Sequence, residues 1–80
     1  MSARILLVED EAGVAIVVSD LLRAEGHEVE TAREGRDGLH RATGAKFDLL
    51  ILDVMLPGLG GFEICHAVRE QGFDGAILML

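Results

Sequence analysis

Residues 47–62 read FDLLILDVMLPGLGGF: an apolar run that stops at one carboxylate, Asp53, and continues into a loop rich in proline and glycine. Residues 48–52 predict a strand that is apolar on both faces, which is typical of a parallel sheet covered by helices on both sides. In such sheets the functional groups lie just beyond the carboxyl ends of the strands. Asp53 is therefore predicted at a functional position.

The rest of the chain alternates strands and helices. Further strands are predicted at residues 4–8, 28–32 and 76–80, and helices at 12–25, 34–43 and 61–71. The helices are predicted from apolar residues at helical spacing. These are Val14, Val17, Val18, Leu21 and Leu22 in the first helix, Leu39 and Ala42 in the second, and Phe62, Cys65 and Val68 in the third. The alternation predicts a three-layer α/β sandwich.

Right-handed crossovers predict how the layers are arranged. With the parallel strand order 2-1-3-4, the first helix covers one face of the sheet and the other two helices cover the opposite face. The direction of winding reverses between strands one and three, and ligand sites of open α/β sheets lie at such points. Glu9 and Asp10 follow strand one and Asp53 follows strand three. We expect the three carboxylates to converge there.

Three like charges within a few ångströms favour either retained protons or a bound cation. Oxygen ligands suit Mg²⁺, which binds through one or two carboxylates plus a phosphate. The cluster thus indicates a site for phosphoryl transfer with a carboxylate nucleophile. Each part also has a simpler explanation: Glu9 to Glu11 would be favourable acids at the start of a helix, and Asp53 alone could be a turn residue.

Composition narrows the class of protein. The chain has 80 residues, a net charge of −7 and one cysteine, Cys65. It is predicted to form one domain, residues 1–80, without an internal disulfide, and a reducing cytoplasm is the expected compartment. The negative charge argues against nucleic acid or an anionic membrane as a direct partner, and no apolar run is long enough to span a bilayer, so we expect no membrane partner.

Three segments, RILLVEDE, TAREGRDGL and DLLILDVMLPGLGGFEI, resemble the receiver domain of two-component response regulators, and the resemblance covers residues 4–80. It implies a flavodoxin-like fold in which Asp53 accepts a phosphoryl group from a histidine kinase. It also implies that Glu9, Asp10, Asp53 and the backbone carbonyl of Met55 hold Mg²⁺. Under this resemblance the module is a signalling protein and not an enzyme.

The sequence departs from the family pattern in two respects. Gly60 and Gly61 stand where many members have Asp-Gly. Members run to roughly 120 residues, so the resemblance implies a domain truncated after the fourth strand, without the fifth strand, the last two helices, and the hydroxyl and lysine that contact the phosphoryl group. The only lysine, Lys46, is predicted at the opposite end of the sheet.

Three functions remain open at this stage. The first is a phosphoacceptor receiver. The second is a receiver that is not phosphorylated and acts in assembly, because strand four would be a bare sheet edge with an uncovered apolar face; a homodimer or a domain-swapped oligomer is expected. The third is a small Mg²⁺-dependent phosphatase with an Asp53 phosphoenzyme.

Overall fold

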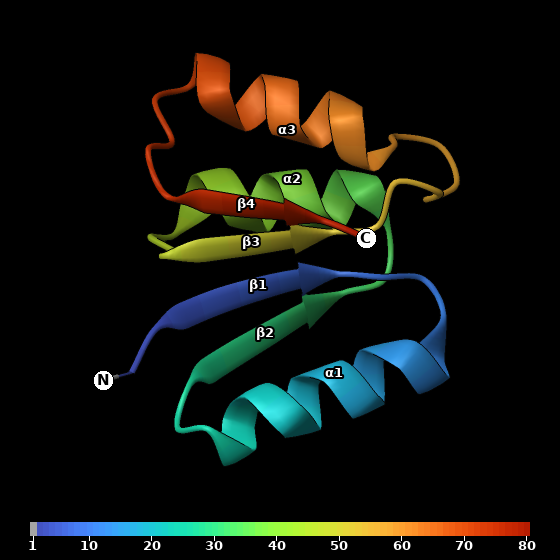
Figure 1. Ribbon diagram of the computed structural model, residues 1–80. Coiled ribbons are helices and arrows are strands. Elements are labelled where there is room, and N and C mark those ends of the chain that lie inside the picture. The colour runs from blue at the N-terminus through green and yellow to red at the C-terminus, as the bar shows by residue number, and fades with distance from the viewer. Residues whose placement is uncertain (1) are drawn as a thin grey trace.

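The computed structural model describes residues 2–80, which form seven elements in strict alternation (Figure 1). They are β1 (Arg4–Val8), α1 (Ala12–Ala24), β2 (Glu28–Ala32), α2 (Gly35–Gly44), β3 (Leu49–Leu52), α3 (Gly61–Glu70) and β4 (Ala76–Met79). Every predicted boundary lies within one residue of the observed one.

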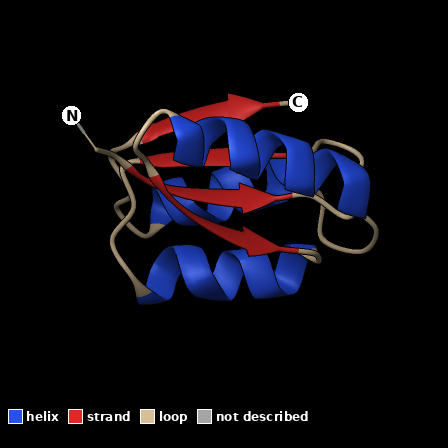
Figure 2. Ribbon diagram, turned by 90° about the horizontal axis from the view of Figure 1, so that it is seen from below, coloured by secondary structure: helices blue, strands red, loops and turns tan. Residues whose placement is uncertain are grey.

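The four strands form one parallel sheet in the order β2-β1-β3-β4, as predicted. The register pairs Ile5 with both Val29 and Leu49, and Val8 with both Ala32 and Leu52. Helix α1 lies on one face, and α2 and α3 lie together on the other (Figures 1 and 2). The fold is therefore the predicted flavodoxin-like three-layer sandwich.

Strand β3 is buried on both faces, which is the property expected of its apolar run. Leu50 and Leu52 are fully buried in the core beneath α2 and α3. Ile51 points the other way and is buried in the smaller core beneath α1. Because successive side chains of a strand alternate between faces, this one strand contributes to both cores.

The apolar stripe of α1 correctly predicts a helix but not its buried face. Ala15 and Ser19 are the buried residues of α1, with Val18 and Leu22 packed at the edge of the core. Val17 is 58% exposed and Leu21 is 64% exposed. The reason is that α1 packs chiefly over β2 and β1, so the side of its wide stripe that faces away from these strands has nothing to contact.

The predicted stripe of α3 needs a similar correction. Val68 is buried and Cys65 is partly buried, but Phe62 is 66% exposed and Ile64, which the stripe omitted, is fully buried. Gly61, the first residue of α3, is packed against the backbone of Asp53 and so faces the sheet. The next residue of a helix is turned by about 100°, which directs Phe62 outward.

The rotation of α3 about its axis, which buries Ile64 and exposes Phe62, is testable by conservative substitution. Ile64→Val should lower the free energy of unfolding by about 0.5–1.5 kcal/mol, because it removes a methyl group from a filled core. Phe62→Leu, its matched control on the exposed face, should change it by less than about 0.5 kcal/mol. Urea denaturation measures both values. A larger loss of unfolding free energy for Phe62→Leu than for Ile64→Val would contradict this rotation of α3.

Candidate functional site

The carboxyl ends of β1 and β3 lie side by side because the two strands pair in parallel, and sheet hydrogen bonds continue one residue beyond each strand. The N–H of Glu9 donates to the carbonyl of Ala32 at 3.0 Å, and the N–H of Asp53 donates to the carbonyl of Val8 at 3.0 Å. Both acidic residues are thus held by the sheet itself. Their positions depend on strand pairing and not on the conformation of a free loop.

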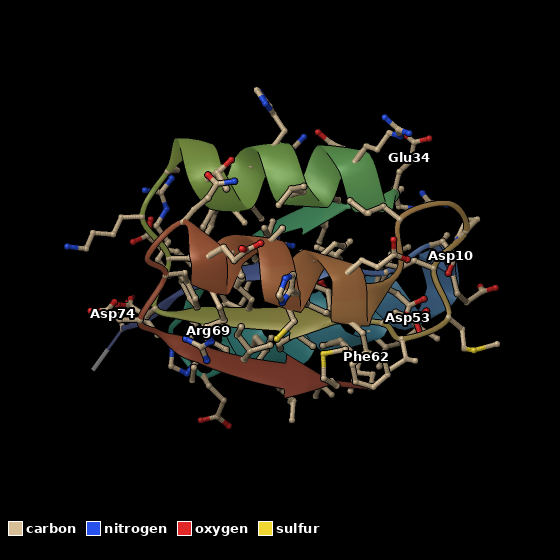
Figure 3. The ribbon with its side chains drawn as sticks, turned by 90° about the horizontal axis from the view of Figure 1, so that it is seen from above. Asp10, Glu34, Asp53, Phe62, Arg69 and Asp74 are labelled. Carbon is tan, nitrogen blue, oxygen red and sulfur yellow. The ribbon has the colours of Figure 1, made fainter. Side chains whose placement is uncertain are left out.

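Glu9, Asp10 and Asp53 converge, as the strand order predicts. Each offers one carboxylate oxygen, and these oxygens all lie within 4.8 Å of one another. Glu9 is buried, Asp53 is partly buried and Asp10 is exposed. In Figure 3 the labelled Asp10 and Asp53 lie at the same end of the sheet, on the side where the strands finish. The cluster is therefore open to solvent through Asp10 and closed beneath by Glu9.

The electrostatics of the cluster are unfavourable for its most buried member. Burial raises the pKa of Glu9 above its usual value, and interactions with the neighbouring Asp53 and Asp10 raise it further. One hydrogen bond opposes this rise, because the N–H of Glu11 donates to Glu9 Oε2 at 2.9 Å and stabilises the charged form. A cation among these oxygens would remove the repulsion.

The donor set suits a hard divalent cation. All three side chains provide carboxylate oxygens, which Mg²⁺ prefers, and Asp10 leaves the cluster accessible to water, which Mg²⁺ retains in its coordination shell. Histidine and cysteine, the usual ligands of zinc, contribute nothing to this cluster among the described residues. The residues present therefore fit Mg²⁺ chemically.

Met55 lies in the loop that follows β3. Its side chain is 82% exposed, while its N–H donates to Asp53 Oδ1 at 2.9 Å. That hydrogen bond fixes the orientation of the Asp53 carboxylate from within its own loop. Leu56, only 7% exposed, anchors the same loop in the core beneath α2 and α3.

Glu11 and Arg33 lie near the cluster and have different roles. Glu11 is the N-terminal cap of α1, where its Oε1 accepts the N–H of Gly13 at 3.2 Å, so the simple helix-start explanation holds for this acid. Arg33 follows β2 and donates from Nη2 to the backbone carbonyl of Asp10 at 3.3 Å. Sequence reasoning missed this contact, although the position of Arg33 just beyond a parallel strand was a usable signal.

The opposite end of the sheet has a different character. Lys46 lies there, as predicted, beside a cavity of about 330 Å³ whose lining includes Phe47, Phe73 and Asp74. None of the three clustered carboxylates lines that cavity. Over residues 2–80, no helix has both the length and the apolar character needed to cross a membrane.

Comparisons with a family model and with individual relatives point to the same protein family. The family model of the response regulator receiver domain matches residues 5–80. The transcriptional regulatory protein TcrA of Mycobacterium tuberculosis is 43% identical over 77 residues, which cover 96% of this chain and 30% of TcrA. The chain therefore spans about a third of the length of that relative.

Solved structures of response regulators have the same fold as this chain. The chemotaxis response regulator CheY4 of Vibrio cholerae superposes with a TM-score of 0.94 at 42% identity, covering 99% of this chain and 68% of that one. The response regulator TrrA, solved in complex with the histidine kinase ThkA, superposes with a TM-score of 0.87 at 34% identity, covering 95% and 66% of the respective chains. TrrA of Thermotoga maritima has also been solved in complex with Mg²⁺-BeF, with a TM-score of 0.90 at the same identity and coverage.

The match to the family model over nearly the whole chain, with an acidic cluster at the carboxyl ends of β1 and β3, leads to one conclusion. This chain belongs to the response regulator receiver domain family.

Proposed function

We propose that the chain is a phosphoacceptor module of two-component signalling that takes a phosphoryl group from a histidine kinase onto Asp53. The observation that carries this proposal is the convergence of Glu9, Asp10 and Asp53 at the reversal point of the sheet. Three acids from two separate strands meet at this one point, although their mutual repulsion is unfavourable in the absence of a cation.

Asp53 is the proposed acceptor because it is the acid best placed to act as a nucleophile. The N–H of Met55 holds its Oδ1, which leaves Oδ2 as the attacking oxygen. In the proposed step the N–P bond of a phosphohistidine breaks as a bond between the Asp53 oxygen and phosphorus forms, and the imidazole leaves. Glu9 is too buried for in-line attack, and Asp10 lacks a comparable hydrogen bond to fix its carboxylate among the described contacts.

Glu9, Asp10, Asp53 and the backbone carbonyl of Met55 are the proposed ligands of Mg²⁺. The cation, when bound, supplies positive charge that offsets both the carboxylates and the incoming phosphoryl oxygens. The fit of an all-oxygen donor set and the raised pKa of Glu9 support this assignment. TrrA, a relative of the same fold, has been solved with Mg²⁺-BeF.

The proposed partner is a protein and not a small molecule. The cluster is open to solvent through Asp10, and the TrrA receiver has been solved with a histidine kinase. The module accepts a group onto its own side chain and turns over no separate substrate, so we do not propose an enzyme, and the phosphatase alternative is set aside. A net charge of −7 argues against direct nucleic acid binding, and we propose a cytoplasmic location.

Acceptance at Asp53 can be measured by intact mass. After incubation with acetyl phosphate and Mg²⁺, the chain should gain one phosphoryl group, and the gain should be lost with EDTA or in Asp53→Asn. Asp20→Asn, which changes an exposed carboxylate on α1, is the matched control and should be modified like the unaltered chain. A folded protein without an adduct, or an adduct retained in Asp53→Asn, would refute the proposal.

The burial of Glu9 leads to a second prediction, which concerns how the stability of the fold depends on pH. Because its folded-state pKa is raised, the charged form of Glu9 destabilises the fold, and this loss develops as the pH rises from the unfolded pKa through the folded one. Glu9→Gln should therefore raise the melting temperature at pH 7 in EDTA. The advantage should disappear below about pH 4, where glutamate is protonated in both states.

Glu9→Gln also tests whether Glu9 is a ligand of Mg²⁺. Mg²⁺ should raise the melting temperature of the unaltered chain, because a ligand bound only by the folded state stabilises it, and should have little effect on Glu9→Gln. Glu11→Gln, two residues away on the helix cap, is the control and should keep the Mg²⁺ response. An equal Mg²⁺ response in Glu9→Gln would remove Glu9 from the proposed ligand set.

Within residues 2–80, β4 is an edge strand, and this favours self-association as a second candidate function of this chain. The N–H groups of Ala76 and Leu80 donate to carbonyls of β3 and its flanking residue, so the alternation of a parallel ladder directs those of Ile77 and Met79 outward. Leu78 and Leu80 are 50% and 51% exposed. Figure 2 shows β4, which ends at the label C, at the margin of the sheet. Within β4 itself, no charged residue or proline protects this edge.

Two copies could pair their β4 strands in antiparallel fashion about a two-fold axis at Leu78, with Ile77 of each copy opposite Met79 of the other. Light scattering at micromolar protein should then report a dimer. Leu78→Lys should give a monomer, because it opposes like charges at the axis. Ile16→Lys, on an exposed position of α1, is the control and should remain dimeric. A monomeric unaltered chain would exclude this candidate.

A further inference from the structure

Glycines that begin two different helices contact the loop of residues 53–60, which carries the proposed acceptor. Gly35 is the first residue of α2 and Gly61 is the first residue of α3, and both are buried. In Figure 3, Glu34, the residue before Gly35, lies at the same end of the sheet as Asp10 and Asp53. The starts of α2 and α3 therefore flank the acceptor loop.

Neither position has room for a side chain. A Cβ atom at Gly35 would overlap the carbonyl oxygen of Leu59 and lie 2.8 Å from its carbonyl carbon. A Cβ atom at Gly61 would lie 2.6 Å from the carbonyl oxygen of Asp53. In both cases the nearest obstructing atom is a backbone carbonyl oxygen, so a change of side-chain rotamer alone cannot relieve the contact. The loop is held by direct packing of backbone on backbone.

Helix α2 also packs closely on β1. A Cβ atom at Gly38 would lie 2.6 Å from Cγ2 of Val8, so α2 already lies as close to β1 as a side chain of that strand permits. Val8 immediately precedes Glu9 in the cluster. One rigid connection therefore joins β1, the start of α2 and the acceptor loop at Leu59.

We infer that Gly35 is a positioning residue for the acceptor loop: it has no side chain, so Leu59 packs against the start of α2 and Asp53 is held beside Glu9. The inference rests on the proposed function of Asp53. Met55 lies four residues before Leu59 in the same loop and donates to Asp53 Oδ1, so a displacement at Leu59 reaches the carboxylate through a short segment that Leu56 anchors in the core.

Gly35→Ala tests the inference, with Gly44→Ala as its matched control. Gly44 ends the same helix, and a Cβ atom added there would meet no neighbouring atom within 4 Å, so the control makes the same chemical change in open space. Amide NMR spectra of the cation-free proteins should show shifts at residues 53–60 for Gly35→Ala only. The Mg²⁺ dissociation constant should rise about tenfold, as for other changes to residues that orient metal ligands.

The amide shifts of the loop and the Mg²⁺ dissociation constant distinguish a positioning role of Gly35 from an effect on stability alone. A folded Gly35→Ala whose loop amides and Mg²⁺ affinity match those of Gly44→Ala would overturn the inference, whatever its melting temperature. If the unaltered chain binds no Mg²⁺ and accepts no phosphoryl group, the proposed function fails, yet the cation-free spectra still report whether Gly35 sets the loop position.

A second variant covers the case in which Gly35→Ala does not fold. Combining it with Leu59→Gly removes the Leu59 Cβ, which would lie 3.0 Å from the new Cβ at position 35, and frees the loop to retreat. The double variant should fold and bind Mg²⁺ about tenfold more weakly than Leu59→Gly alone. Equal affinities, or a double variant that is also unfolded, would make Gly35 a residue of the core only and overturn the positioning role.

Discussion

The parallel pairing of β1 with β3 is the contact on which the rest of this structure depends. It matches Leu6 with Leu50 and Val8 with Leu52, and it continues into the hydrogen bond from the N–H of Asp53 to the carbonyl of Val8. Both strands are apolar on both faces, so burial of their side chains drives the pairing. The same register places the acidic residues that follow the two strands next to each other.

That arrangement brings mutually repelling carboxylates together at the ends of β1 and β3, which are themselves stabilised by burial of their apolar side chains. Burial and neighbouring charge raise the pKa of Glu9, and only a tightly packed sheet can hold repelling carboxylates at this distance. Native proteins commonly accept such local destabilisation at functional sites. The cluster therefore lowers the stability of the cation-free fold at this point.

The acceptor loop is positioned by the absence of side chains as much as by their presence. Gly35 and Gly61 meet carbonyl groups of Leu59 and Asp53 with no space between them, while Leu56 anchors the loop in the core. The chain belongs to a family whose member TrrA has been solved with a histidine kinase. It spans about a third of the length of its relative TcrA.

The sequence by itself determined the elements, their order and the carboxylate cluster. Periodicity is a local property, and the right-handed crossover rule converts a β-α-β-α-β-α-β order into few sheet arrangements. Tertiary structure alone decided which side of each helix is buried. Val17 and Leu21 belong to an apolar stripe yet remain exposed, because α1 covers chiefly β2 and β1. Phe62 is exposed and Ile64 buried because close packing of Gly61 on Asp53 sets the rotation of α3. The contact of Arg33 with Asp10 and that of Gly35 with Leu59 likewise depend on how loops and helix starts pack on one another, which neither periodicity nor the crossover rule specifies.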